Sequence, residues 1–414
     1  MESWRKALRA WASLLASNLI VRAYPPRRSQ PAISTRIPAC GKFPYNGRGD
    51  MHIPDGYLSP STCMTLYVFS ASGWYAALKR IKGMMHTRAI PLISVFAAFA
   101  FVVMMFNVPL PGGTTGHAVG VTVATIVLGP WGSILAISIA LAIQALFFGD
   151  GGITTLGANC FNMAIVGSFA AFAVYRMLAA RSEPSARRRI LAAGIAGYVA
   201  INASALLAAI EFGIQPLFFH DAHGAPLYAP YPPHVAIPAM MIGHLTFAGL
   251  AEAAISAGMI SYLQRADISL LGGVKDFSAD RSMSPATAAA FSQGRLWALV
   301  AALMLLTPLG ILAAGTAWGE WSAAEYADSD ARARIEASSG QHAAPTTIPA
   351  GMKRLSSVWT APFPNYAPRF IKSAAFGYVM SAMFGVGVLL LASLLFRSLL
   401  LRSPGEKGRS RVSP

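Results

Sequence analysis

Long stretches of this chain carry no charged side chain, and this feature limits the fold more than any other. The longest stretch runs from Ala89 to Gly149 without a single Asp, Glu, Lys or Arg. Only 12% of the residues are charged, whereas 55% are hydrophobic. Such runs exceed what a soluble core needs, and they match several membrane crossings of about 20 residues each. The sequence therefore predicts an all-α fold, a polytopic membrane helical bundle.

Turn signals divide these runs into shorter segments. The sequences NVPLPGG at 107–113 and GPWG at 129–132 interrupt the longest run, because Gly and Pro punctuate helices. The expected segments are 62–79, 89–106, 117–128, 131–148, 158–177, 190–211, 236–263, 296–317 and 373–396. Segment 117–128 is short for a full crossing. We therefore expect about seven helices in the first part and two C-terminal transmembrane helices.

The basic residues lie in loops, and their distribution predicts which loops face the cytoplasm. Lys and Arg are concentrated at 79–88, 181–189, 265–295 and 397–411, which alternate as the positive-inside rule requires. The loops 107–116, 149–157, 212–235 and 318–372 contain fewer basic residues for their length and are expected outside. The net charge of +16 thus reflects membrane topology, and we expect no nucleic-acid partner. Met51 is predicted to lie outside.

This topology brings several polar features to the outer face. Met51 and His52 precede the first segment, His117 follows an outer loop, and the turn GDGG occupies 149–152. If Met51 is the N-terminus, its amine, the His52 amide nitrogen and the His52 ring form two fused chelate rings. His117 can supply a fourth nitrogen. Planar nitrogen sites favour Ni(II) or Cu(II), whereas zinc prefers a tetrahedral set.

Taken singly, these residues have simpler interpretations. A histidine near a helix end is often a packing residue, and Met-His alone is uninformative. His220 and His223 share an outer loop with Asp221, where a solvated loop is the better interpretation than weak metal binding. The three cysteines show no CxxC spacing and indicate neither a zinc site nor a disulfide framework.

Three sequence blocks resemble a known family. MHIPDGYLSPSTC at 51–63, GTTGHAVG at 113–120 and QALFFGDGGITTLGANCFNMAIVG at 144–167 closely resemble the CbiM/NikM family, the substrate-capture subunits of energy-coupling factor transporters for cobalt and nickel. The resemblance covers about 51–263. It implies a four-nitrogen site made by the Met51 amine, the His52 amide and ring, and the His117 ring. It also implies seven helices with the N-terminus outside.

The same resemblance implies the wider system. The transported substrate is Ni2+ or, second, Co2+, and the protein lies in the lipid of the cell inner membrane with its metal site on the extracytoplasmic face. A transmembrane coupling subunit and two cytoplasmic ATPase subunits are the implied partners. The chain contains no G-x-x-x-x-G-K-[ST] phosphate loop, so ATP hydrolysis is expected in those partners.

Other functional classes remain open at this point. A metal-dependent intramembrane enzyme needs an acid, base or nucleophile beside the ion, and neither Ser nor Glu is visibly paired with His52 or His117. We therefore expect no catalytic residue. A metal sensor or receptor without transport is a further alternative.

The sequence predicts five parts. Residues 1–50 precede the usual family start and form a cleaved signal-like segment, a genuine extension or, as we favour, a non-native stretch from a start assigned too far upstream. The capture domain is expected at 51–264, a cytoplasmic linker at 265–295 and a basic cytoplasmic tail at 398–414. Residues 296–397 resemble a NikN-like two-helix companion with an extracytoplasmic loop, although an ordinary two-helix appendage is the alternative. The polar stretch 318–372 is expected to be flexible.

Polar residues inside the apolar segments are candidates for supporting roles. Gln144, Asn159 and Asn162 can orient a histidine ring by hydrogen bonding, or they can hold the helices together. Glu252 is unfavourable in lipid and should face the bundle interior. A role for Glu252 in translocation or partner docking is open.

Overall fold

The structure is a computed structural model, and it describes residues 52–82, 89–110, 114–179, 185–266, 268–272, 293–313, 316–368 and 370–401. These residues belong to one compact unit that runs from Gly47 to Pro414. Met51, the N-terminal extension 1–50, most of the predicted linker and the tail after Leu401 lie outside the described residues.

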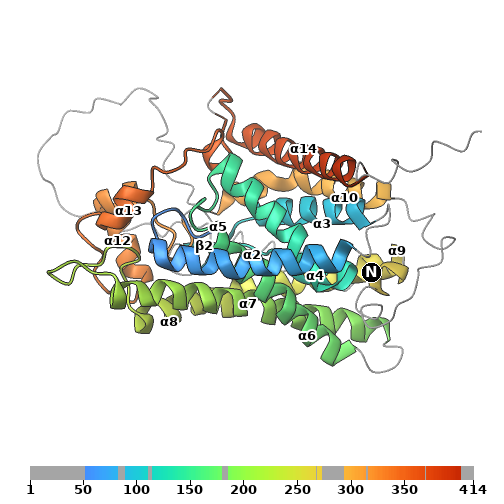
Figure 1. Cartoon of the computed structure of the whole chain (residues 1–414), viewed down its shortest axis with the longest axis horizontal. Coiled ribbons are helices and arrows are strands. Elements are labelled where there is room, and N and C mark those ends of the chain that lie inside the picture. The colour runs from blue at the N-terminus through green and yellow to red at the C-terminus, as the bar shows by residue number, and fades with distance from the viewer. Residues whose placement is uncertain are drawn as a thin grey trace, which may run out of the picture. The chain divides into compact units, whose positions relative to one another are not determined.

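Helices make up nearly all of the regular structure in the described ranges (Figure 1). The first part contains α2 (Pro60–Lys82), α3 (Ala89–Met104), α4 (Val121–Ile143), η1 (Gln144–Phe148), α5 (Leu156–Asn159), η2 (Cys160–Val166), α6 (Gly167–Ala179), α7 (Ala186–Phe218), α8 (Pro233–Gly243), η3 (His244–Ala248), α9 (Gly249–Ala266) and η4 (Ile268–Gly272). The second part contains α10 (Gln293–Leu306), η6 (Thr307–Leu312), α11 (Ala323–Ala327), α12 (Ser329–Ser338), α13 (Ala350–Leu355), η7 (Pro364–Tyr366) and α14 (Ala374–Leu401). A small antiparallel hairpin, β1 (Val108–Leu110) and β2 (Thr114–Gly116), pairs Val108 with Gly116.

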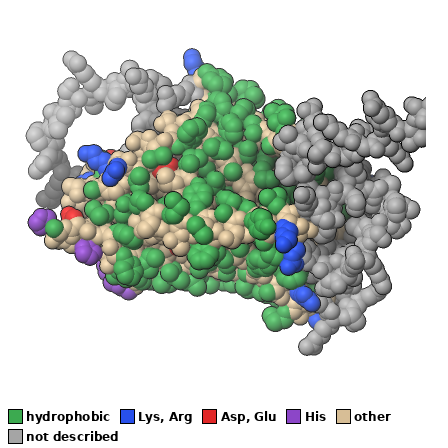
Figure 2. Space-filling view, in the orientation of Figure 1, with side chains coloured by type: hydrophobic (Ala, Val, Ile, Leu, Met, Phe, Trp, Pro, Cys, Tyr) green, Lys and Arg blue, Asp and Glu red, His purple; other side chains and the backbone are tan. Residues whose placement is uncertain are grey.

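The helices form a polytopic membrane bundle, as the sequence predicts. Six of the described helical stretches are long and apolar enough to cross a membrane: Val121–Phe148, Leu156–Ala179, Ala186–Phe218, Pro233–Ala266, Gly294–Leu312 and Ala374–Leu395. The surface supports this assignment, because hydrophobic side chains cover the middle of the visible face (Figure 2). Large apolar side chains such as Met64, Phe69 and Leu191 are exposed. Exposed apolar side chains of this size are expected where lipid surrounds the helices.

The chain reverses direction inside the stretch Val121–Phe148. Gly129 has φ 71° and ψ 168°, which is not helical, and Pro130 follows it. Two residues twelve positions apart in a straight helix are separated by about 18 Å along its axis. Here the Ser133 hydroxyl donates to the carbonyl oxygen of Val121 at 3.3 Å. The two halves therefore fold back on each other, so the described residues 52–266 contain the seven helical segments expected from the sequence.

Protein rather than lipid surrounds the central helix α3. Every residue from Val95 to Met105 is buried, and α4, α10 and α14 pack around it. Small residues allow α7 and α9 to cross closely: a Cβ added at Gly197 would lie 2.7 Å from the Ser256 hydroxyl oxygen. Close approach at small residues is typical of membrane bundles.

The segment between η6 and α14 is folded, and this corrects the expectation of a flexible stretch at 318–372. It contains α11, α12, α13 and η7. Trp318, Trp321 and Tyr326 are buried and share a hydrophobic cluster with Tyr57 and Phe212 of the first part. The expectation failed because it weighed the polar composition of 324–345 alone. Ile335 and Met352 of this segment belong to the same cluster.

The C-terminal helix α14 packs against α3, and Figure 1 shows the two helices alongside one another. Their contact depends on Gly385, because a Cβ there would lie 2.2 Å from the ring of Phe101. Phe101 is fully buried against Phe148 and Tyr366, so its ring has little room to move. Nothing lies within 4 Å of a Cβ added at Gly387, two residues further along.

These two glycines allow a matched test of the packing of α14. Gly385→Ala should lower the melting temperature of the detergent-purified chain, because overpacking costs about 1–3 kcal/mol. Gly387→Ala should leave it unchanged or raise it slightly, since Ala favours the helix by about 1 kcal/mol. Equal melting temperatures for the two variants would contradict this packing.

Candidate metal centre

His52 lies in the loop that precedes α2, and its ring is buried, with 2% exposed. Its Nδ1 atom lies 2.8 Å from Oδ1 of Asp150. A neutral imidazole that donates from Nδ1 carries its lone pair on Nε2. The Nε2 atom is buried and has no hydrogen-bond partner among the described residues. A buried nitrogen of this kind needs an explanation, and a metal ligand provides one.

His117 follows the β1–β2 hairpin and is also buried, with 7% exposed. Its Nδ1 atom lies 3.0 Å from the carbonyl oxygen of Ala118. A carbonyl oxygen only accepts hydrogen bonds, so Nδ1 must be the donor, which places the lone pair of the neutral ring on Nε2. Both histidines therefore have the tautomer that metal-binding imidazoles use when a second partner holds the other ring nitrogen.

The two rings are close enough to share one ion. Their centroids are 5.0 Å apart, at an interplanar angle of 62°. A ring whose nitrogen is about 2.0–2.1 Å from an ion has its centre about 3.2 Å from that ion. Two such rings are about 4.5 Å apart at a right angle and about 5.2 Å apart at the tetrahedral angle. The observed separation falls between these values, so the pair fits a single ion.

Asp150 connects His52 to residues from two other segments. Its second oxygen, Oδ2, accepts a hydrogen bond from the Tyr366 hydroxyl at 2.6 Å, and the Gln144 amide nitrogen lies 3.5 Å from it. Gln144 also donates to the Tyr366 hydroxyl at 2.9 Å. Burial, together with the Asp150 charge, raises the pKa of Tyr366 well above its ordinary value. Tyr366 therefore keeps the proton that it donates to Asp150.

Glycines let the Asp150 turn approach the His52 loop. Gly151 has φ 87°, and a Cβ there would lie 2.9 Å from the His52 Cβ atom. A Cβ at Gly152 would lie 2.4 Å from the backbone nitrogen of Asp55. The Gly152 amide donates to the carbonyl oxygen of Ile53 at 2.9 Å. The GDGG sequence is thus required by this close contact between two loops.

Two side chains, Asn159 and Asp55, connect the His52 loop to α5 and to the turn that precedes it. The Ile53 amide donates to Oδ1 of Asn159 at 3.1 Å, and Nδ2 of Asn159 donates back to the carbonyl oxygen of Ile53 at 3.2 Å. Asp55 accepts from the backbone amides of Ile153 and Thr154, at 3.1 and 2.7 Å. These contacts set the position of the residue next to His52.

Glu252 fixes the His117 loop in a comparable way. Its Oε2 atom accepts hydrogen bonds from the Val119 and Gly120 amides, at 2.7 and 3.0 Å. Oε1 lies 3.4 Å from the hydroxyl of Ser256. Gly120 is the N-cap of α4, where a carboxylate satisfies amides that lack helical partners. Glu252 therefore faces the interior, as predicted, and positions the backbone two residues from His117.

The structure brings together four of the residues singled out from the sequence, and Asp150 with them. His52 and His117 are neighbours, Gln144 reaches the Asp150 carboxylate, and Asn159 holds the residue after His52. Asn162 lies elsewhere, because its amide nitrogen donates to Glu211 at 2.9 Å. Met51 is outside the described residues. Within those residues, no group of three or more His, Cys, Asp or Glu could hold a metal ion, so the two imidazoles need other donors.

Sequence reasoning missed the roles of Tyr366, Asp55 and Glu252. Tyr366 lies in the short element η7, which has the sequence Pro-Asn-Tyr. Its partner Asp150 is 216 positions away along the chain, and no local pattern predicts such a contact. The only signal available in the sequence was that polar residues stand next to large aromatic residues around Tyr366.

Two family descriptions match the chain. Residues 52–270 match the CbiM family, described as a cobalt uptake substrate-specific transmembrane region. Residues 293–402 match the PDGLE domain. The first match contains every described histidine and carboxylate of the candidate site, and the second contains Tyr366.

The chain is also similar to individual transport proteins. It is 50% identical over 339 residues to the fused nickel transport protein NikMN of Rhodobacter capsulatus, covering 82% of this chain and 95% of that protein. It is 38% identical over 344 residues to the probable fused nickel transport protein LarMN of Lactiplantibacillus plantarum, covering 82% of this chain and 96% of that protein. A crystal structure described as a transition metal transporter matches with 46% identity and a TM-score of 0.50, over 56% of this chain and all of that one.

The contact between Tyr366 and Asp150 can be tested with a single-atom change. Tyr366→Phe removes the hydroxyl but keeps the ring stacked on Phe148, whose centroid is 4.6 Å away. Loss of the hydrogen-bond partner of a ligand-holding group should weaken Ni2+ binding by about 10–100-fold, measured by isothermal titration calorimetry.

Tyr326→Phe is the matched control, because its buried hydroxyl bonds to Tyr57 at 2.7 Å and not to the site. It should have a similar effect on melting temperature but none on Ni2+ affinity. Unchanged affinity in Tyr366→Phe, or equal weakening in the control, would refute the role of Tyr366.

Glu252 offers a second test of positioning. Glu252→Ala should reduce Ni2+ affinity by about 10–100-fold, because the loop after His117 loses the acceptor of two amides. Glu252→Gln keeps an oxygen at this position and should lose less. Ser256→Ala removes only the hydroxyl beside Oε1 and should bind as the parent does. Parental affinity in a folded Glu252→Ala variant would rule the role out.

Proposed function

Because the chain belongs to the CbiM family of cobalt uptake transmembrane regions and continues into a PDGLE domain, we propose that it captures nickel, or secondarily cobalt, for import. The ion is the transported substrate, held at the pair His52 and His117. One observation carries this proposal: two buried imidazoles lie 5.0 Å apart, close enough to share one ion.

The remaining donors are proposed to come from the backbone. A free amine at Met51 and the amide nitrogen of His52, which must release its proton to bind the ion, add two nitrogens beside the ring of His52. A chelate through the His52 amide closes only with Nδ1, the ring nitrogen nearer the backbone. In the structure Nδ1 contacts Asp150, so loading requires a half-turn of the ring. That turn moves Nε2 towards the Asp150 side, where the carboxylate can accept a hydrogen bond from it.

This donor set favours nickel. Four nitrogens in a plane suit Ni(II), and Cu(II) would bind more tightly still, so selectivity depends on geometry and metal availability. The fused relatives with matching length are named nickel transport proteins, whereas other relatives are named cobalt transport proteins. The extended similarity to the fused proteins supports nickel as the first substrate.

The proposal includes a division of labour along the chain. Residues 51–264 act as the capture domain, and 296–397 act as a companion whose outer segment contributes Tyr366. The site faces the extracytoplasmic side of the inner membrane. A transmembrane coupling subunit and two cytoplasmic ATPases supply the energy. The proposal requires that the working chain begin at Met51, since residues 1–50 would otherwise occupy its amine.

Replacing His117 tests this function. His117→Ala should lower the number of Ni2+ ions bound per purified chain by one, and it should abolish nickel uptake by cells that express the complete transporter. His244→Ala is the matched control, because His244 also bonds a backbone carbonyl oxygen through Nδ1, at 3.0 Å, but belongs to η3. The control should bind and transport as the parent does.

Two outcomes would contradict the proposal. An unchanged number of bound Ni2+ ions per chain in His117→Ala would exclude the site. Normal binding by the parent chain without any uptake in the presence of its partners would favour a sensor or receptor over a transport subunit.

A further inference from the structure

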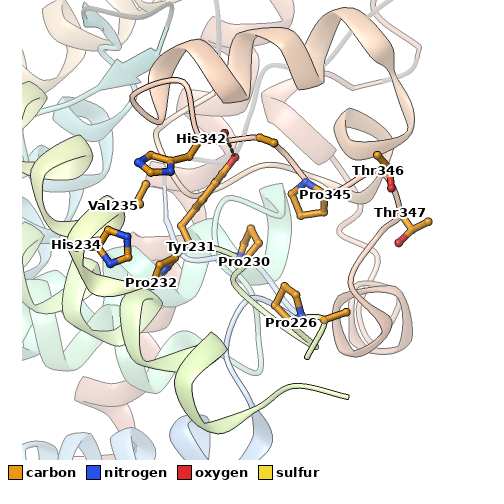
Figure 3. A pocket seen from close by; sticks show the side chains of 12 residues that line it. Pro226, Pro230, Tyr231, Pro232, His234, Val235, His342, Pro345, Thr346 and Thr347 are labelled. Carbon is orange, nitrogen blue, oxygen red and sulfur yellow. Dashed lines mark hydrogen bonds between the residues drawn. The ribbon is translucent and has the colours of Figure 1, made fainter. Parts of the chain in front are cut away.

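A second pair of histidines lies at the edge of a separate hollow. The hollow has a volume of about 430 Å³ and is lined by residues from 225–235 and 342–347. It therefore lies between the segment that leads into α8 and the turn that follows α12. Figure 3 shows His234 and His342 side by side at one end of it.

The two rings are placed to share an ion. Their centroids are 6.0 Å apart, at an interplanar angle of 73°. Two imidazoles bound to one ion have centres about 5.2 Å apart at the tetrahedral angle and at most about 6.4 Å apart. The observed separation is wider than the tetrahedral value, so rotation of the side chains must bring the rings closer before both bind one ion. Both side chains are exposed, so a hydrated ion can reach them.

Hydrogen bonds from buried aromatic side chains hold the turn that carries His342 in place. Gly340 and Gln341 both have positive φ, 65° and 64°, which an L-residue such as Gln341 rarely adopts. The Tyr231 hydroxyl donates to the carbonyl oxygen of His342 at 3.3 Å. The indole nitrogen of Trp318 donates to the Ser339 hydroxyl at 3.2 Å. The turn is therefore anchored on buried aromatic rings, which keeps its position defined.

His234 is equally well placed. It is the second residue of α8, which begins at Pro233, and the neighbouring Tyr231 packs on Trp318 and Trp321 with ring centroids 5.9 and 6.0 Å apart. The same aromatic cluster thus supports both histidines. Backbone strain at an anchored position often accompanies function. Here the strained residue, Gln341, directly precedes the imidazole of His342.

We propose that His234 and His342 form a second, outer metal site for a divalent transition ion such as Ni2+, Cu2+ or Zn2+. Imidazole suits these ions, whereas carboxylate and carbonyl oxygens suit Mg2+ and Ca2+. None of the described residues that line the hollow is acidic. Water completes the coordination. The site combines one histidine from each of the two family matches, and it shares no residue with the pair His52 and His117.

The test removes the inner pair first, so that the two sites are counted separately. Full-length chain carrying His117→Ala is dialysed in detergent against increasing Ni2+, and bound metal is measured by mass spectrometry. One ion per chain should remain. Adding His342→Ala or His234→Ala should raise the half-saturating Ni2+ concentration at least about tenfold, since even the loss of a ligand's hydrogen-bond partner weakens binding about 10–100-fold.

His223→Ala in the same background is the matched control. His223 is an exposed histidine in the loop between α7 and α8 that does not line the hollow, so its replacement should leave the titration unchanged. The proposal is overturned if His117→Ala binds no ion, or if both added substitutions leave its binding unchanged. These results differ from failure of the inner site, which would appear as identical binding by the parent chain and His117→Ala.

Discussion

The hydrogen bond between Asp150 and His52 is the interaction on which the candidate site depends. A buried carboxylate is unfavourable unless hydrogen-bond donors surround it. Asp150 meets this need with donors from three segments: the His52 ring, the Gln144 amide and the Tyr366 hydroxyl. Satisfying one buried charge therefore ties the loop before α2, the start of η1 and the segment between η6 and α14 together around one imidazole.

His117, the second histidine, is positioned in a different way. Glu252 does not contact His117 in the described hydrogen bonds but accepts the next two backbone amides after Ala118. One imidazole is thus set by a direct side-chain bond and the other by the backbone around it. Both arrangements bury a carboxylate that the fold must satisfy, so the requirements of stability and of ligand geometry coincide. The reversal at Gly129 supports the same arrangement, because it returns the chain to the His52 side of the bundle for the Asp150 turn.

The sequence predicted the parts of this structure that follow from long apolar runs and from the turn residues and charged loops that interrupt them. Charge-free runs and turn residues were enough for the helical segments, and the spacing of polar residues on one predicted face was enough to bring His52 and His117 together. It did not predict Tyr366 or the role of Glu252, because their partners are 216 and up to 133 positions away and follow from packing alone. The segment between η6 and α14 was wrongly expected to be flexible. Three of its large aromatic residues are buried in a shared cluster, and this burial holds the segment in place despite its polar composition.

The central claim is that four nitrogens surround the captured ion, two from imidazoles and two from the Met51–His52 backbone. X-ray absorption spectroscopy at the nickel edge of the nickel-loaded chain with His342 replaced by Ala tests it most directly. The account predicts the spectrum of a square-planar Ni(II) ion with four nitrogen donors. A six-coordinate spectrum with two imidazoles and oxygen donors would show that the backbone nitrogens do not bind, and it would contradict the account.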